Sequence, residues 1–261
     1  MIAFTREVSP SIARCELTHL ARTPIDLDRA RAQHRVYEAA LASLGCIVRR
    51  LPDTPGLPDA VFVQDAALVF DELAVVARPG AASRRAETAT VAAALAPFRP
   101  LRFIEPPGTL DGGDVVCFGR VVIVGQTPRT NIDAVRQLAA ILTPFGYAVT
   151  TAAPTGCLHL QTAVTPVADR ALLVNPAWVD PAVFGDIEVI AVDPAEPFAA
   201  NALRVRDALI YPDSFPRTRA RLEARGLRIV PVDVSELAKA EAGVTCCCLL
   251  VPAAVPGQAT T

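Results

Sequence analysis

The chain has 261 residues, of which 52% are hydrophobic, and carries a formal net charge of −2. This length is ample for a core, and no apolar run reaches the roughly 18 residues that a membrane-spanning helix needs. The near-neutral charge and the absence of a basic stripe argue against nucleic acid as a partner. The first residues lack the basic-then-apolar order of a secretory signal, so we expect a cytoplasmic protein with no membrane partner and with reduced cysteines.

The first elements that we expect are a short strand and one long helix. Residues 2–4 have the apolar character of a strand. Residues 26–44 form the clearest helix, because apolar side chains recur at three- and four-residue steps and Asp26 is a good N-cap. Gly45 is expected to end this helix, and a strand is expected directly after it.

From about residue 68 the sequence repeats one pattern. Two short apolar strands are joined by a tight turn and followed by a loop with an arginine, a helix and a further strand. A repeated supersecondary unit indicates a repeat architecture, and units set around an axis form a closed ring with loops gathered at one end. We therefore predict a single α/β domain, residues 1–261, built as a ring of about five ββαβ units. Closure of the ring would place the last strand beside the first unit.

Three consecutive cysteines lie near the end of the chain. They occupy residues 246–248, after Gly243 and before the apolar residues 249–251, which are typical of a buried strand. Adjacent cysteines make poor disulfide partners. A thiol at the mouth of a buried strand is a suitable nucleophile, although free cysteine is also common as a small core residue.

The three histidines differ in their surroundings. His34 lies on the apolar face of the long helix and is expected in the core, whereas His19 lies in a loop and is expected to be solvated. His159 lies in an expected strand, residues 157–164, with leucine neighbours that face the other way. A polar face on an apolar strand needs partners or lines a site, so His159 is the candidate base.

Carboxylates cluster in two stretches, at residues 57–65 and 108–114. In the second stretch two glycines lie between acidic residues, which indicates either a close approach of the backbone to another group or a plain turn. Carboxylates can bind a planar guanidinium in a bidentate manner. Arg84 and Arg129, from equivalent repeat loops, suit the carboxylate of an amino acid. The combination predicts a site with an acidic end for a guanidinium and a basic end for an α-carboxylate.

These features resemble the dimethylarginine dimethylaminohydrolases, within the guanidine-modifying amidinotransferase superfamily. The resemblance covers nearly the whole chain as an ordered series of motifs. They are LPDAVFVQD at 57–65, RPGAASRRAE at 78–87, GTLDGGD at 108–114, RTN at 129–131, LHL at 158–160, FAAN at 198–201 and GVTC at 243–246. The resemblance implies a five-bladed α/β propeller, the pentein fold. It also implies hydrolysis of Nω-methylated arginine to citrulline with release of dimethylamine or methylamine.

The resemblance further implies roles for individual residues. Cys246 matches the nucleophile of the family, His159 matches its general acid/base, and Asp111 matches an acidic residue that holds the histidine and the substrate. Asp65 matches the carboxylate that binds the guanidinium nitrogens. The other implied substrate contacts are Gln64 beside Asp65, Asp59 with the backbone carbonyls of Leu17 and Ala240 for the α-amino group, and Arg84 with Arg129 for the α-carboxylate.

Gln64 departs from the family, which usually has glutamate before the guanidinium-binding aspartate. Glutamine keeps the size and the hydrogen bonding but loses a charge, so another guanidino or ureido substrate, as in an arginine deiminase, is an alternative. A non-catalytic ligand-binding relative and a thiol redox sensor are further alternatives. We expect a small guanidino amino acid as ligand, a homodimer, and no cofactor, with zinc at Cys246 and His159 only as an inhibitor.

Overall fold

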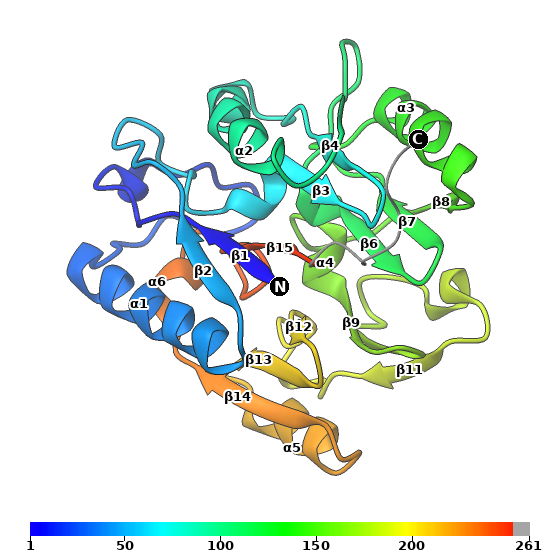
Figure 1. The fold of residues 1–261 in the computed structure, drawn as a ribbon. Coiled ribbons are helices and arrows are strands. Elements are labelled where there is room, and N and C mark those ends of the chain that lie inside the picture. Colours follow the sequence, from blue (N-terminus) through cyan, green and yellow to red (C-terminus); the bar gives the residue numbers. More distant parts are fainter. Residues whose placement is uncertain (253–261) are drawn as a thin grey trace.

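The computed structural model describes residues 1–252, which form five three-stranded sheets around a common centre (Figure 1). The sheets consist of β3 (Ala67–Val69), β4 (Ala74–Val76) and β5 (Leu101–Phe103); β6 (Val115–Phe118), β7 (Val121–Gly125) and β8 (Ala148–Ala152); β9 (Val164–Ala168), β10 (Ala171–Val174) and β11 (Glu188–Ala191); β12 (Leu203–Val205), β13 (Ala208–Pro212) and β14 (Arg228–Val232); and β15 (Leu249–Val251), β1 (Ile2–Thr5) and β2 (Ile47–Arg50).

Each sheet has the same topology, in which the middle strand is antiparallel to the first strand and parallel to the third. The expected five-bladed α/β propeller is therefore confirmed. The fifth sheet joins the two ends of the chain, since β1 pairs with β15 in the register Ile2 to Val251. The last strand thus lies beside the first, as the repeat pattern predicted, and no blade is left as an open end of the ring.

The helices lie mainly between the second and third strands of a blade. They are α1 (Leu27–Ser43), α2 (Thr88–Leu95), α3 (Ile132–Leu142) and α5 (Pro216–Glu223), with two single-turn helices, α4 (Leu160–Ala163) and α6 (Ser235–Ala238). The side chain of Asp26 accepts the N–H of Arg29 and caps α1, and Gly45 follows the helix with φ +78°, as expected. The blade of β9, β10 and β11 has instead a 3-10 helix, Pro181–Phe184, between β10 and β11.

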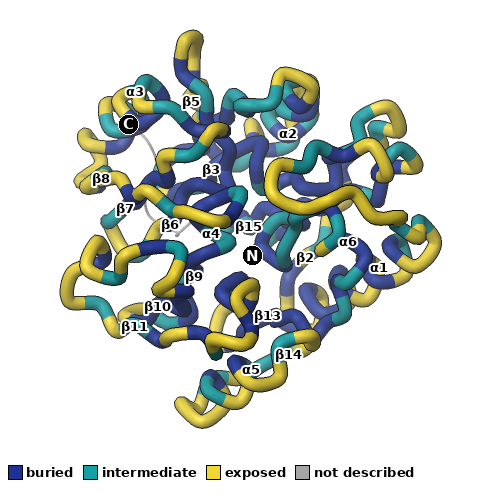
Figure 2. The backbone as a smooth tube through the Cα atoms, turned by 180° about the vertical axis from the view of Figure 1, so that it is seen from behind, coloured by how far each residue is buried: buried dark blue, intermediate teal, exposed yellow. Residues whose placement is uncertain are grey.

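The first strand of each blade faces the centre of the ring. These inner strands are β15, β3, β6, β9 and β12; in Figure 2 the central backbone is mostly dark, whereas exposed residues lie in outer turns and helices. The inner strands surround a hollow of about 530 Å³ that reaches the hairpin turns at Gly119 and Asp169. The N-terminal ends of the inner strands lie at the end of the ring opposite these hairpin turns. The loops that precede the inner strands carry the polar motifs.

None of the helices among residues 1–252 is both long and apolar enough to cross a bilayer.

Tyr37 connects α1 to the segment that carries the cysteine run. Its side chain is fully buried, and its hydroxyl donates to the carbonyl oxygen of Val244 (2.8 Å). We predict that Tyr37→Phe lowers the free energy of unfolding by about 1–3 kcal/mol, because it leaves a buried carbonyl without this donor. Denaturant unfolding measures the change.

The matched control is Tyr147→Phe. Its hydroxyl bonds to Glu72, whose side chain is partly exposed and also pairs with Arg120, so water can replace the lost contact. If Tyr37→Phe lowers the free energy of unfolding no more than Tyr147→Phe does, the bond to Val244 does not stabilise the cysteine segment.

Candidate active site

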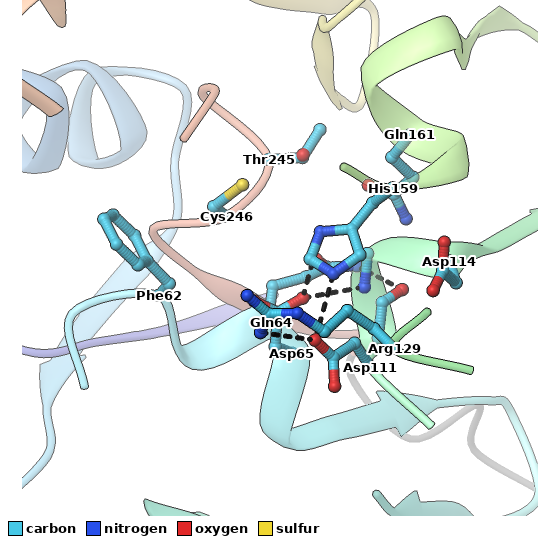
Figure 3. Close-up of polar contacts among 12 residues, drawn as sticks. Phe62, Gln64, Asp65, Asp111, Asp114, Arg129, His159, Gln161, Thr245 and Cys246 are labelled. Atoms are coloured by element: carbon cyan, nitrogen blue, oxygen red, sulfur yellow. Dashed lines mark hydrogen bonds and ion pairs between the residues drawn. The ribbon is translucent and has the colours of Figure 1, made fainter. Parts of the chain in front are cut away.

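The residues singled out in the sequence come together because each precedes an inner strand. Asp65 lies just before β3, Asp111 just before β6, His159 before β9 and Cys246 before β15. All the inner strands begin at the same end of the ring, so loops that are far apart in sequence meet there. Figure 3 shows the His159 ring between Cys246 and the carboxylates of Asp65 and Asp111.

The expected strand through His159 is wrong. His159 has an extended backbone, but it is the N-cap residue of α4, and β9 begins only at Val164. The reason is a buried carboxylate: Asp114 accepts the N–H of Leu160 (3.0 Å) as well as the hydroxyls of Thr127 and Thr130 (both 2.6 Å). Satisfying Asp114 turns the chain after His159, which alternation of apolar residues does not reveal.

His159 is paired with Asp111. Nε2 of His159 lies 3.0 Å from Oδ2 of Asp111, and the other oxygen of Asp111 accepts the N–H of Gly80 (2.9 Å). Burial alone would lower the pKa of His159, but the carboxylates of Asp65, Asp114 and Asp111 outweigh burial and raise this pKa to about 9. The imidazole is therefore protonated at neutral pH.

The Gly-Gly pair permits a close approach of backbone to side chains, as one of the two interpretations of this stretch predicted. A Cβ at Gly113 would lie 2.7 Å from Nδ1 of His159 and 2.9 Å from Oδ1 of Asp65. At Gly112 it would lie 2.1 Å from the carbonyl oxygen of Gln64. Neither glycine has a positive φ, so the requirement is for space.

Asp65 belongs to a buried ion network. Nη1 of Arg84 donates to Asp65 (2.6 Å), and Nη2 of Arg84 donates to Glu87 (2.9 Å). The second oxygen of Asp65 accepts the N–H of Gly113 (2.9 Å). Burial opposes ionisation of Asp65, yet His159 and Arg84 hold its pKa below the usual value. Burial raises the pKa of Glu87 to about 7, although Arg84 favours the carboxylate.

Arg84 also donates to the carbonyl oxygens of Asp59 (3.3 Å) and Phe62 (3.2 Å). Its donors are thus largely engaged within the protein, and a substrate carboxylate would have to displace one of these partners. Arg129 differs: its Nη1 lies 3.6 Å from Oδ2 of Asp111 and has no hydrogen-bond partner among the described residues. Of these two arginines, Arg129 is therefore the one with a free donor.

Cys246 lies in a turn before β15, and Cys247 and Cys248 beside it are buried. Its Sγ accepts the N–H of Gly243 (3.4 Å). Burial, with the nearby charge of Asp65, raises the pKa of the Cys246 thiol to about 11. Within the described residues the thiol is not hydrogen-bonded to His159. Because the pKa of Cys246 is about 11 and that of His159 is about 9, the free site holds a neutral thiol and an imidazolium at neutral pH.

A small cavity, which we call the charged cavity, connects these groups. Its walls include Glu16, Asp59, Asp65, Arg84, Arg129, His159, Ala240 and Cys246. Asp59 accepts the N–H of Glu16, and burial raises the pKa of this carboxyl. Leu17 follows Glu16 in the same loop but does not itself line the cavity. The structure thus brings together most of the residues expected from the sequence.

Gln64 also lies outside the charged cavity. Its side chain donates to the carbonyl oxygen of Gly112 (3.0 Å) and lines the hollow between the inner strands, not the charged cavity. Its backbone N–H donates to the carbonyl oxygen of Cys246 (3.2 Å). An amide can donate to Gly112, whereas an ionised glutamate cannot, which is a physical reason for glutamine at this position.

Two positioning residues were not assigned a role from the sequence. Asn201 accepts the N–H of Thr245 (3.1 Å) and donates to its hydroxyl (2.8 Å), which fixes the residue before Cys246. Glu241 accepts backbone N–H groups of Thr18, His19 and Leu20. Asn201 belongs to the FAAN motif at residues 198–201. Glu241 carries no local signal, because its partners lie more than 200 residues away in the sequence.

One group of described residues has the spacing of metal ligands. Single ligand atoms of Asp65, Asp111 and His159 lie within 4.8 Å of one another. Arg84 and Arg129 lie against the same carboxylates, so the group is already balanced by protein cations.

Comparison with known proteins agrees with this geometry. No family model matches the chain. The chain is 34% identical to the N(G),N(G)-dimethylarginine dimethylaminohydrolase of Pseudomonas aeruginosa over 88% of this chain and 90% of that one. The chain belongs to the dimethylarginine dimethylaminohydrolase family. A second member, from Streptomyces coelicolor, is 37% identical over 94% of each chain.

Solved structures of the dimethylarginine dimethylaminohydrolase family have the same fold. A cysteine-to-serine mutant of the Pseudomonas aeruginosa protein, in complex with citrulline, gives a TM-score of 0.90 at 32% identity, covering 95% of this chain and 97% of that one. The N-terminal domain of ArgZ, an arginine dihydrolase from cyanobacteria, gives a TM-score of 0.81 at 20% identity, covering 95% of this chain and 96% of that one. The latter likeness concerns the fold alone.

The raised thiol pKa predicts slow alkylation of Cys246 in the free protein. Because the thiolate is the reactive form and the pKa is about 11, the iodoacetamide rate constant should rise about tenfold per pH unit between pH 7 and 10. Mass spectrometry of the Cys246 peptide separates this reaction from that of exposed Cys117. A rate that levels off below pH 8 would contradict a raised pKa.

Glu241 is predicted to hold the loop at residues 18–20 closed. Glu241→Gln replaces charge-assisted hydrogen bonds with weaker neutral ones, so local opening should increase about tenfold. Hydrogen exchange of a peptide that covers this loop measures the effect. Glu223→Gln, a half-exposed glutamate on α5, is the control. Equal exchange in the two variants would refute the role of Glu241.

Proposed function

We propose that this protein hydrolyses Nω-methylated arginine, as asymmetric dimethylarginine or monomethylarginine, to citrulline and dimethylamine or methylamine. The observation that carries the proposal is one cavity lined by Cys246, His159 and Asp65 together with Asp59 and Arg129, with Asp111 buried behind His159 and bonded to it. Membership of the dimethylarginine dimethylaminohydrolase family supports a hydrolase acting on C–N bonds of linear amidines.

The guanidinium is proposed to bind against Asp65 and Asp111. Each carboxylate oxygen has a second lone pair, so both residues can accept from the substrate while keeping their present partners. This positions the guanidinium carbon between Cys246 and His159, in the space that Figure 3 shows. We assign the α-carboxylate to Arg129, with Arg84 orienting Asp65, and the α-amino group to Asp59 with the carbonyls of Leu17 and Ala240.

The chemistry begins with a neutral thiol. The bound cation lowers the pKa of Cys246 because an adjacent positive charge stabilises the thiolate, and the thiol proton is released to solvent. The thiolate attacks the guanidinium carbon, and His159, protonated at neutral pH, gives its proton to the leaving amine. Water then cleaves the covalent thiouronium with His159 as base, which releases citrulline. Asp111 holds the imidazole in place through both steps.

This reaction scheme uses no organic cofactor or catalytic metal. We propose zinc only as an inhibitor that competes for Cys246 and His159, since thiolate and imidazole are its preferred ligands. We also propose that the chain forms a single domain, because β15 and β1 bring its two ends into one sheet. A homodimer stays a prediction.

The test is citrulline formation from asymmetric dimethylarginine, monomethylarginine and arginine, each measured separately. We expect turnover of the methylated substrates, and no turnover in Cys246→Ser, because its hydroxyl is a far weaker nucleophile. Near-ultraviolet circular dichroism checks that the variant is folded.

Other outcomes select other functions. Turnover of arginine alone, with release of ammonia, would favour a deiminase. Turnover that survives in Cys246→Ser would exclude the covalent mechanism. No turnover by the folded wild-type protein would favour a ligand-binding relative.

A further inference from the structure

A second cavity opens on the other side of Cys246 and His159. It has a volume of about 260 Å³, and we call it the apolar cavity. It shares Leu158, His159, Glu241, Ala242 and Cys246 with the charged cavity. The two cavities therefore meet at the reactive thiol. In Figure 3, Thr245 and Gln161 mark the side of the apolar cavity, and Asp65 and Arg129 mark the charged side.

The two cavities differ in their chemistry. The charged cavity is lined by carboxylates and arginines. The wall of the apolar cavity exposes mainly hydrophobic surface, to which Leu20, Leu158, Phe198, Phe215, Val234 and Ala238 contribute, and its polar residues include Gln161, Ser214 and Ser235. Phe198 is 43% exposed and packs edge-on against Trp178, with ring centroids 4.9 Å apart. An exposed aromatic beside a reactive group is suited to bind an apolar part of a ligand.

The polarity of the cavities fixes the direction of a bound substrate. The α-amino and α-carboxylate groups need the charges of Asp59 and Arg129, and the guanidinium carbon must lie at Cys246. The substituted terminal nitrogen is at the opposite end of the molecule from the α-carbon. Its substituents therefore extend toward the apolar cavity.

The apolar cavity is far larger than methyl groups require. A water molecule, close to a methyl group in size, needs only about 15 Å³ of such volume. We propose that the enzyme also hydrolyses arginines whose terminal nitrogen carries a longer apolar chain, from ethyl to butyl. This inference rests on the proposed function and extends its substrate class.

The reaction with a longer chain is the same displacement. Sγ of Cys246 forms a bond to the guanidinium carbon, and the bond from that carbon to the alkylated nitrogen breaks. The nitrogen takes a proton from His159 and leaves as the primary alkylamine. One water molecule then hydrolyses the thiouronium to citrulline, and His159 recovers its proton. Each added methylene that enters the apolar cavity should raise kcat/KM by about fourfold, the factor expected for burial of one methylene.

The experiment measures citrulline and amine release from Nω-methyl-, ethyl-, propyl- and butylarginine. We expect kcat/KM for butylarginine to equal or exceed that for methylarginine. Ala238→Phe fills the apolar cavity from an exposed position of α6 and should lower the butyl-to-methyl ratio of kcat/KM at least tenfold. Ala220→Phe, at an exposed position of α5 outside the cavity, should leave the ratio unchanged.

A second variant tests the same cavity in case Ala238→Phe does not fold. Phe198→Ala removes part of the apolar wall from an exposed site and should also lower the butyl-to-methyl ratio. Turnover of methylarginine with butylarginine more than tenfold worse would overturn the inference and leave the proposed function intact. An unchanged ratio in both cavity variants would likewise overturn it. No turnover of any member of the series would refute the proposed function, and this inference with it.

Discussion

The structure depends on a set of acidic and basic side chains buried at one end of the ring. Six of them are at most 5% exposed: Asp65, Arg84, Glu87, Asp111, Asp114 and His159. Burying a charge is costly unless it is paired and hydrogen-bonded. Each carboxylate here has a cation nearby, and each of the three aspartates also accepts a backbone N–H. The bond from Leu160 to Asp114 explains the turn after His159, and the close approach of His159 and Asp65 explains the glycine at 113.

This electrostatic balance also sets the chemistry. The acidic groups stabilise an imidazolium at His159, and burial together with the charge of Asp65 keeps the Cys246 thiol neutral. In the proposed reaction, a bound guanidinium would stabilise the thiolate. Selectivity for a cationic substrate and activation of the thiol would then have one physical cause, which is the proximity of the bound cation to Sγ.

The propeller supplies the geometry through its repeated topology. Because every blade begins with an inner strand in the same direction, the residue that precedes each inner strand faces the same central space. The blades contribute different groups: carboxylates from the blades of β3 and β6, the histidine from that of β9, Asn201 from that of β12, and the thiol from that of β15. Pairing of β1 with β15 fixes the strand that directly follows the turn of Cys246.

The sequence by itself determined the repeated unit, the capped helix at residues 26–44 and the closure of the ring, and its motifs singled out Cys246, His159 and Asp65, which the structure brings together. These features depend on local periodicity and on ordered motifs, both of which can be recognised in the sequence. Only the tertiary structure decided that His159 caps a helical turn, that Arg84 is engaged by Asp65 and Glu87, that the Gln64 side chain faces the hollow, and that Glu241 holds a loop more than 200 residues away. The physical reason is that these are choices among buried polar partners, and such partners come from other blades, where spacing in sequence carries no information about distance.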